Sequence, residues 1–152
     1  MRGSALLGAL AAILAQVNLI QAQGSFEYCS YYYSQYCYIQ SGAAYSFIGG
    51  YGYNFIYTTA ADYSVIGGGW SNYIYDGMAT ISGGMYGTAY QYQSTVSGGG
   101  YNRAVGPYST VSGGWTNYAG GYASVVQGGW TNGAYGSWSN VGGGKSNIVY
   151  NT

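Results

Sequence analysis

After residue 45 the sequence repeats itself in register. Pairs of glycines recur at fixed intervals and align seven segments, which begin at Ser46, Ser64, Ala79, Ser94, Ser109, Ser124 and Ser139. The first interval spans eighteen positions, and each of the next five spans fifteen. A fixed period of this length is typical of a stacked array, in which each unit buries its apolar face against its neighbours. Disordered Gly/Ser/Tyr-rich tracts share the composition but lack a register.

Equivalent residues of the repeats share one chemistry. The third position is always β-branched: Ile48, Ile66, Ile81, Val96, Val111, Val126 and Val141. The eleventh is always small or aliphatic: Ile56, Ile74, Ala89, Ala104, Ala119, Ala134 and Val149. Because the third and eleventh positions are both odd-numbered, their side chains face the same side of an extended chain, whereas a helix would scatter them around its circumference. The pattern predicts an all-β fold: a parallel β-solenoid, or β-roll, of about seven fifteen-residue coils.

Two further columns indicate turns between the strands. The fifth position is glycine throughout: Gly50, Gly68, Gly83, Gly98, Gly113, Gly128 and Gly143. The ninth is asparagine in six repeats, as Asn54, Asn72, Asn102, Asn117, Asn132 and Asn147, with Gly87 in the third. Asparagine and glycine are both tolerated in a left-handed turn, whereas glycine would interrupt a buried amide ladder. Gly87 therefore favours the turn interpretation over the ladder.

The N-terminus has the arrangement of a secretory signal peptide, since Arg2 precedes an apolar run over residues 5–20. We expect residues 1–22 to be removed, and the mature chain to be secreted with no membrane segment. Tyrosine-rich residues 23–45 would then cap the solenoid of residues 46–152. In an oxidising compartment Cys29 and Cys37 are expected to form a disulfide, because their spacing fits neither a redox motif nor a zinc site.

The composition disfavours several classes of function. Charged residues make up 4% of the chain and histidine is absent, so the basic surface of a nucleic-acid binder and the commonest catalytic base are both missing. Asp62 and Asp76, the acids within the repeats, lie two and three residues before their next repeats and are not expected to share a face. The sequence therefore predicts no enzyme, no cofactor and no metal site.

The residues at equivalent positions of the repeats also form a pattern that resembles a known family. The pattern Ser-x-Val-x-Gly-Gly-x-x-Asn-x-Ala-x-Gly, best matched at residues 94–106 and 109–121, resembles the head repeats of YadA-type trimeric autotransporter adhesins. The resemblance covers about residues 46–152. It implies a left-handed parallel β-roll and, by analogy, a trimeric adhesive surface. The chain departs from that family in its fifteen-residue period and its lack of a heptad stalk.

Aromatic residues are expected to face outward in place of the charges usual on a soluble surface. They comprise Tyr57, Tyr75, Tyr90, Tyr135, Tyr150, Tyr73, Tyr118, Trp70, Trp115 and Trp130. Such a stripe favours an association surface, although the rings could instead pack over their own chain. The last repeat also stops short of a full coil without a polar cap. We therefore expect a secreted structural or adhesive protein whose partner is itself, as a trimer or filament.

Two alternative functions remain open. Trp115 and Trp130, on adjacent coils, could stack against sugar rings and bind a polysaccharide. Three consecutive repeats also carry a Thr-x-Ser array, which could form an ice-binding face: Thr80, Thr95 and Thr110 with Ser82, Ser97 and Ser112.

Overall fold

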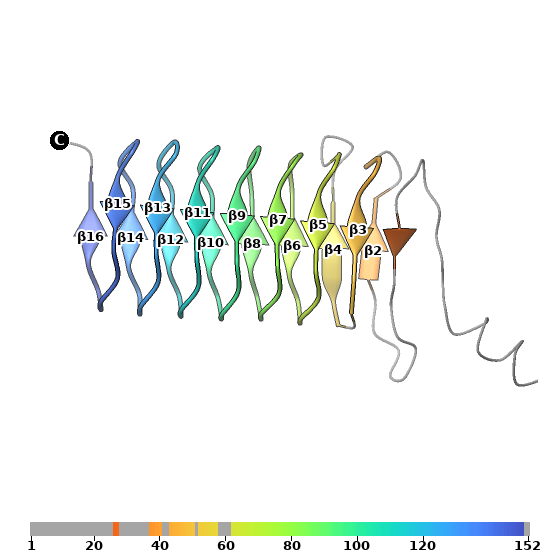
Figure 1. Cartoon of the computed structure of the whole chain (residues 1–152), viewed down its shortest axis with the longest axis horizontal. Helices are drawn as coiled ribbons and strands as arrows, with labels where there is room; N and C mark the ends of the chain where they lie inside the picture. The colour runs from red at the N-terminus through yellow and green to blue at the C-terminus, as the bar shows by residue number, and fades with distance from the viewer. Residues whose placement is uncertain (1–25, 28–36, 41–42, 51, 58–61, 151–152) are drawn as a thin grey trace, which may run out of the picture.

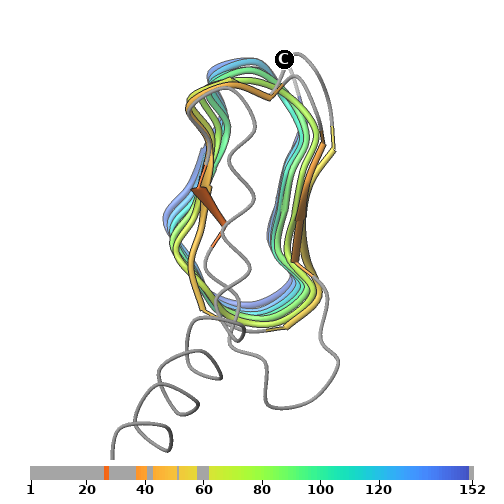
Figure 2. The same ribbon diagram turned by 90° about the vertical axis from the view of Figure 1, so that its right-hand side faces the viewer.

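The fold is a β-solenoid of about seven fifteen-residue coils, as the repeat predicts (Figure 1). The computed structural model describes residues 26–27, 37–40, 43–50, 52–57 and 62–150. Within these ranges the chain contains strands and turns but no helix. Viewed along the stack, the coils superpose as a flattened ring with two long walls (Figure 2). The expected signal peptide and Cys29 lie outside the described residues.

Each wall is a parallel sheet, and among the described residues each holds eight strands. One sheet consists of β1 (Phe26–Glu27), β3 (Phe47–Ile48), β5 (Val65–Ile66), β7 (Thr80–Ile81), β9 (Thr95–Val96), β11 (Thr110–Val111), β13 (Val125–Val126) and β15 (Asn140–Val141). The other consists of β2 (Cys37–Ile39), β4 (Asn54–Ile56), β6 (Tyr73–Ile74), β8 (Thr88–Ala89), β10 (Arg103–Ala104), β12 (Tyr118–Ala119), β14 (Gly133–Ala134) and β16 (Ile148–Val149). We call them the odd sheet and the even sheet.

Strand pairing keeps the repeats in vertical register. Val111 pairs with Val96 on one side and with Val126 on the other, one period away in each direction. The backbone N–H of Thr110 donates to the carbonyl of Ser124 at 2.9 Å, and this bond recurs from coil to coil. Parallel strands lie about 4.8 Å apart, so each coil advances the rod by that distance.

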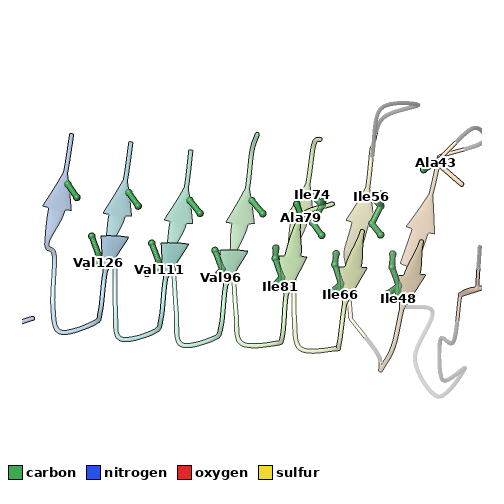
Figure 3. Packing of buried hydrophobic residues seen from close by; sticks show 14 of the residues in the cluster. Ala43, Ile48, Ile56, Ile66, Ile74, Ala79, Ile81, Val96, Val111 and Val126 are labelled. Atoms are coloured by element: carbon green, nitrogen blue, oxygen red, sulfur yellow. The ribbon is translucent and has the colours of Figure 1, made fainter. Parts of the chain in front are cut away.

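The core is a double column of aliphatic side chains between the two sheets (Figure 3). Third-position residues such as Ile48, Ile81 and Val111 are fully buried, and so are the eleventh-position residues from Ile56 to Ala134. In the last coil Val141 is 5% exposed and Val149 is half-buried. The predicted core columns thus lie inside the solenoid.

The N-terminal segment contributes strands of its own to both walls. Phe26 of β1 pairs with Phe47, and Cys37 of β2 pairs with Asn54. Residues expected to cover the first coil therefore include strands that continue both sheets beyond it. Because Cys29 is outside the described residues, the Cys29–Cys37 disulfide stays a prediction.

The prediction of a left-handed turn for the asparagine column is wrong. Asn54, Asn72, Asn102, Asn117 and Asn132 are buried, and no described asparagine has a positive φ. Residues other than glycine adopt a positive φ at the eighth and fifteenth positions instead, where Thr116 has a φ of 57° and Tyr108 one of 59°. The asparagines form the buried amide ladder that Gly87 argues against in the sequence.

The ladder joins each coil to the next. The Nδ2 group of Asn117 donates to the carbonyl of Gly113 in its own coil at 2.9 Å and to that of Gly129 in the next coil at 3.0 Å. Its Oδ1 accepts from the backbone N–H of Asn132 at 2.9 Å. The amide therefore provides hydrogen bonds for carbonyls in the glycine turns of two successive coils, which have positive φ values at Gly113 and Gly129. The asparagine column thus stabilises the turns that the glycines form.

Candidate functional site

Aromatic rings form a continuous stack on the N-terminal half of the even sheet. The rings of Phe55 and Tyr73 lie 5.6 Å apart and nearly parallel, those of Tyr57 and Tyr75 are 5.3 Å apart, and Tyr75 continues to Tyr90 at 5.1 Å. These residues hold the tenth and twelfth positions, whose side chains point away from the core. Stacked rings at this separation attract one another beyond the area that they bury.

The stack resumes on the C-terminal coils of the same sheet. Tyr118 and Tyr135 are 4.9 Å apart, and Tyr135 and Tyr150 are 5.2 Å apart. Here the rings lie over glycines: the ring of Tyr118 covers the position of a side chain at Gly120, and that of Tyr135 covers Gly133. We call both parts together the sheet ladder: Phe55, Tyr57, Tyr73, Tyr75, Tyr90, Tyr118, Tyr135 and Tyr150.

A second column of rings follows one turn of the solenoid. Tyr86 and Tyr101 stack at 4.7 Å, Tyr101 meets Trp115 at 5.1 Å, and Trp115 and Trp130 lie 6.0 Å apart. The indole of Trp115 lies across Gly100, the seventh position of the preceding coil, so a side chain at Gly100 would collide with that indole. Because the two indoles stack on each other, they present less free ring face than a pair of separate sugar platforms would.

A third column, on the opposite turn, was missed in the sequence. Tyr92 meets Tyr108 at 5.8 Å, Tyr108 meets Tyr122 at 5.2 Å, and Tyr122 meets Trp138 at 5.4 Å. These aromatics alternate between the fourteenth and fifteenth positions, so no single column of the repeat reveals them. Trp138 is 74% exposed, the most exposed of the large hydrophobic side chains in the described residues.

The predicted association surface is only partly open to solvent. Tyr90, Tyr135, Tyr150, Trp115 and Trp130 are exposed, with Trp130 at 53% and Tyr150 at 65%. The remaining members are half-buried against neighbouring rings: Tyr57, Tyr73, Tyr75, Tyr118 and Trp70. The rings thus pack on their own chain, as the second interpretation expects, and part of their surface stays open to solvent, so association remains a prediction.

Crowding in the sheet ladder changes the acidity of two phenols. Burial raises the pKa of Tyr57 above its usual value of 10.0, and neighbouring Tyr73 raises it further. Burial likewise raises the pKa of Tyr75, with added repulsion from Tyr57, Tyr73 and Tyr90 that outweighs the opposing attraction of Arg103. These phenols therefore stay protonated beyond the range in which a free tyrosine ionises.

The odd sheet presents a different surface, made of small polar side chains. Thr80, Thr95 and Thr110 pair directly on neighbouring strands, and all three are half-buried. Ser82, Ser97 and Ser112 follow them two residues later and are exposed. The expected Thr-x-Ser array is therefore a regular three-coil patch.

A groove of about 290 Å³ lies on the outer surface of the even sheet near its C-terminal end, where the strands themselves pair without a break. It is lined by Tyr101, Arg103, Thr116, Asn117, Tyr118, Thr131, Asn132, Gly133, Tyr135 and Ile148. The guanidinium carbon of Arg103 lies 5.9 Å from the centre of the Tyr118 ring. Aromatic walls, hydroxyls and a single cation meet here.

Within the described ranges there is no group of three metal-ligating side chains, and no helix is both long and apolar enough to cross a membrane. Asp62 and Asp76 are instead engaged in turns. Oδ1 of Asp62 accepts from the backbone N–H of Ala44, and that of Asp76 accepts from the N–H of Gly77, each at 2.7 Å.

Comparisons with known proteins add no family. No family model matches the chain, and no curated protein matches it. The likeness to autotransporter heads thus remains a likeness of sequence pattern.

Proposed function

We propose that the protein is a secreted structural or adhesive subunit that associates with copies of itself through the aromatic columns on its surface. The observation that carries this proposal is the sheet ladder. It runs along one wall of a rigid rod, and its rings keep exposed faces or edges at Tyr90, Tyr135 and Tyr150. Tyrosine suits such a surface because it buries a large area at low entropic cost and keeps a hydroxyl for hydrogen bonding.

A second copy is the occupant that the chemistry favours. From residue 23 onward the chain has two cationic and three acidic side chains, a formal net charge of 2 − 3 = −1, so little long-range repulsion opposes approach. Rings with an electron-rich face and an electron-poor edge are also complementary to the same rings on another copy. The sheet ladder places rings on successive coils, except at Arg103 and Val105 of the fourth, so it offers several similar contacts, and their small energies add when two rods lie side by side.

Export of the subunit rests on residues 1–22, whose charged start and apolar run suit a signal peptide. The resemblance to adhesin heads supports a role at a surface.

Light scattering and negative-stain microscopy of the chain from residue 23 onward test the proposal. We expect filaments or oligomers at high micromolar concentration, and their loss when Tyr90 and Tyr135 are both changed to Lys. The twelfth position tolerates Val105 and Gly120, so these changes should not unfold the rod. The matched control is Thr95→Lys on the odd sheet, which should leave association intact. A wild-type chain that stays monomeric contradicts the proposal.

The Thr-x-Ser patch favours a second candidate, an ice-binding surface. Direct pairing of Thr80, Thr95 and Thr110 spaces three identical hydroxyl and methyl groups by the regular interstrand distance. Thermal hysteresis of the monomer tests this function. We expect it to disappear in Thr95→Lys and to persist in Tyr90→Lys, so the two variants separate the two candidate functions.

A further inference from the structure

We propose that the groove around Gly133 binds a carboxylated sugar, such as a uronic acid unit of an acidic polysaccharide. The groove has a specific origin. Its floor lies at the tenth position of the sixth coil, where a glycine replaces the large side chains found in the neighbouring coils, Tyr118 and Ile148. The ring of Tyr135 leans into part of the space that the missing side chain leaves, with its Cε2 2.6 Å from the position of a Cβ at Gly133, and the groove is the part that stays open.

The walls fit the apolar face of a sugar ring. Tyr118 and Tyr135 stack on each other at 4.9 Å, so, like the two indoles, they present less free ring face than two separate rings would, and a sugar would meet the exposed part of Tyr135. Tyr135 is 46% exposed, so part of its ring remains open to a ligand. Aromatic rings combine a flat apolar surface with a polar tip, which matches a sugar with C–H groups on one face and hydroxyls around its edge.

The polar groups point to a single negative charge on that sugar. Arg103 is exposed, and it makes no ion pair with any carboxylate in the described parts of the chain. Its position at Tyr118 leaves the planar fork of N–H donors to pair with a carboxylate in two parallel hydrogen bonds. No second cation lines the groove, so its charge matches a carboxylate better than a phosphate dianion.

Two threonines complete the rim. Thr116 and Thr131 occupy the eighth positions of adjacent coils, are exposed, and are held in the left-handed region at φ 57° and 56°. Neither hydroxyl has a hydrogen-bond partner within the described residues. They are thus available to sugar hydroxyls on the side of the groove opposite the leaning tyrosine rings.

The test is a titration of the chain from residue 23 onward with tri-galacturonate, followed by tyrosine and tryptophan fluorescence and by amide chemical shifts. The neutral trimer of galactose with the same linkage is the matched ligand. We expect saturable binding of the acidic trimer, with shifts centred on coils five and six, and at least tenfold weaker binding of the neutral one.

Three variants identify the site. Arg103→Gln removes the cation and should weaken binding of the acidic trimer at least tenfold, while Lys145→Gln removes a cation outside the groove and should not. Gly133→Thr should fill the floor and abolish binding. The new Cβ would lie 2.6 Å from Cε2 of Tyr135, so that ring must turn aside. Thr88 beside Tyr90 shows that the same side-chain pair fits at the equivalent positions, so the variant should fold. Equal binding by Arg103→Gln and wild type, equal affinity for the neutral trimer, or no saturation at millimolar concentrations would each overturn the proposal.

Discussion

The side-chain carbonyl of Asn102 accepts a hydrogen bond from the backbone N–H of Asn117, one coil away, at 2.9 Å. The same bond links Asn117 to Asn132 and Asn132 to Asn147. The Nδ2 groups of Asn102, Asn117 and Asn132 also hold the glycine turns of two successive coils, as Asn102 does with Gly98 and Gly114. A buried polar column of this kind stabilises a single register, because a shift of one residue would leave every member without partners.

Removing one rung should cost more than removing one aliphatic methyl. Asn117→Ala deletes three hydrogen bonds, at about 1 kcal/mol each, and should lower the free energy of unfolding by about 3 kcal/mol. Urea denaturation followed by circular dichroism measures this loss. An effect below about 1 kcal/mol would contradict the assigned role of the ladder.

Gly87 interrupts the ladder and offers the opposite experiment. Its N–H already donates to Oδ1 of Asn72 at 2.8 Å, but it has no amide to offer the next coil. Gly87→Asn should raise the free energy of unfolding by about 1 kcal/mol, since a new rung can bond to the glycine turns. Circular dichroism during urea unfolding measures the gain.

Gly87→Ala is the matched control, because it adds a Cβ without an amide. In both variants the new Cβ would lie 2.9 Å from Oδ1 of Asn72, the end of a buried side chain that four hydrogen bonds hold in place, so both variants must displace it by the same amount. Any cost of that contact is therefore common to the two variants. If both change stability equally, a restored ladder contributes nothing.

The serine column contains hydroxyls with and without partners. The hydroxyl of Ser64 donates to the carbonyl of Asp76 and accepts from the N–H of Ala79, both at 3.2 Å. Those of Ser94, Ser109 and Ser124 are buried and have no hydrogen-bond partner in the described structure. Ser64→Ala should therefore lower stability by about 1 kcal/mol, whereas Ser109→Ala should be neutral or stabilising.

Paired thermal melts of the two serine variants measure the contrast. Ala79 already occupies this position in the third coil, fully buried, so the substitution itself fits the fold. A greater loss in Ser109→Ala than in Ser64→Ala would show that the column is held by interactions other than these hydroxyl bonds.

The left-handed turns carry residues that do not favour them. Ala123 has a φ of 50°, where a Cβ costs about 1 kcal/mol. Ala123→Gly should relieve that cost and raise the guanidinium midpoint of unfolding slightly. Ala119→Gly, the control in β12, should lower it by the equivalent of about 1–2 kcal/mol, because it empties a fully buried position. The opposite ranking would contradict the assigned conformation.

Stability should fall in alkaline solution. The pKa values of Tyr57 and Tyr75 are raised in the folded chain, so between about pH 10 and those raised values the unfolded chain releases phenolic protons that the folded chain retains. Increasing pH therefore favours unfolding in this range. Below it, the stability that the protonated phenols of Tyr57 and Tyr75 contribute is fully present. Melting temperatures from pH 8 to 11 check the slope. The double variant Tyr57→Phe, Tyr75→Phe should show a shallower decline than Tyr101→Phe.

The fifteen-residue period was enough to predict the buried face of the strands and the stacking of the coils. The parity of Ile81, Val96 and Val111 placed them on one face, and the constant period placed them in adjacent coils. The turn chemistry could not be predicted in the same way. Tyrosine, threonine and tryptophan hold left-handed positions here, although nothing in their chemistry favours that conformation over a strand.

The asparagine error has a physical cause. Asparagine suits both a left-handed turn and a buried ladder, and Gly87 favours the turn only if a single glycine breaks the whole ladder. In the structure the ladder simply stops at Gly87 and starts again at Asn102. The groove could not be predicted from the sequence for another reason. Its shape depends on the direction in which the rings of Tyr118 and Tyr135 lean, over Gly120 and Gly133 respectively, and these glycines stand at different repeat positions from the rings that cover them.

The constant pairing between coils has an evolutionary consequence. Since Val111 meets Val96 and Val126 through the same contacts, a whole unit can be copied or deleted by an in-frame change in the coding sequence, and the cut ends rejoin as equivalent neighbours. The number of coils can then change in evolution while the contacts between coils stay the same. A change at one position, such as the glycine at position 133, alters the surface of a single coil.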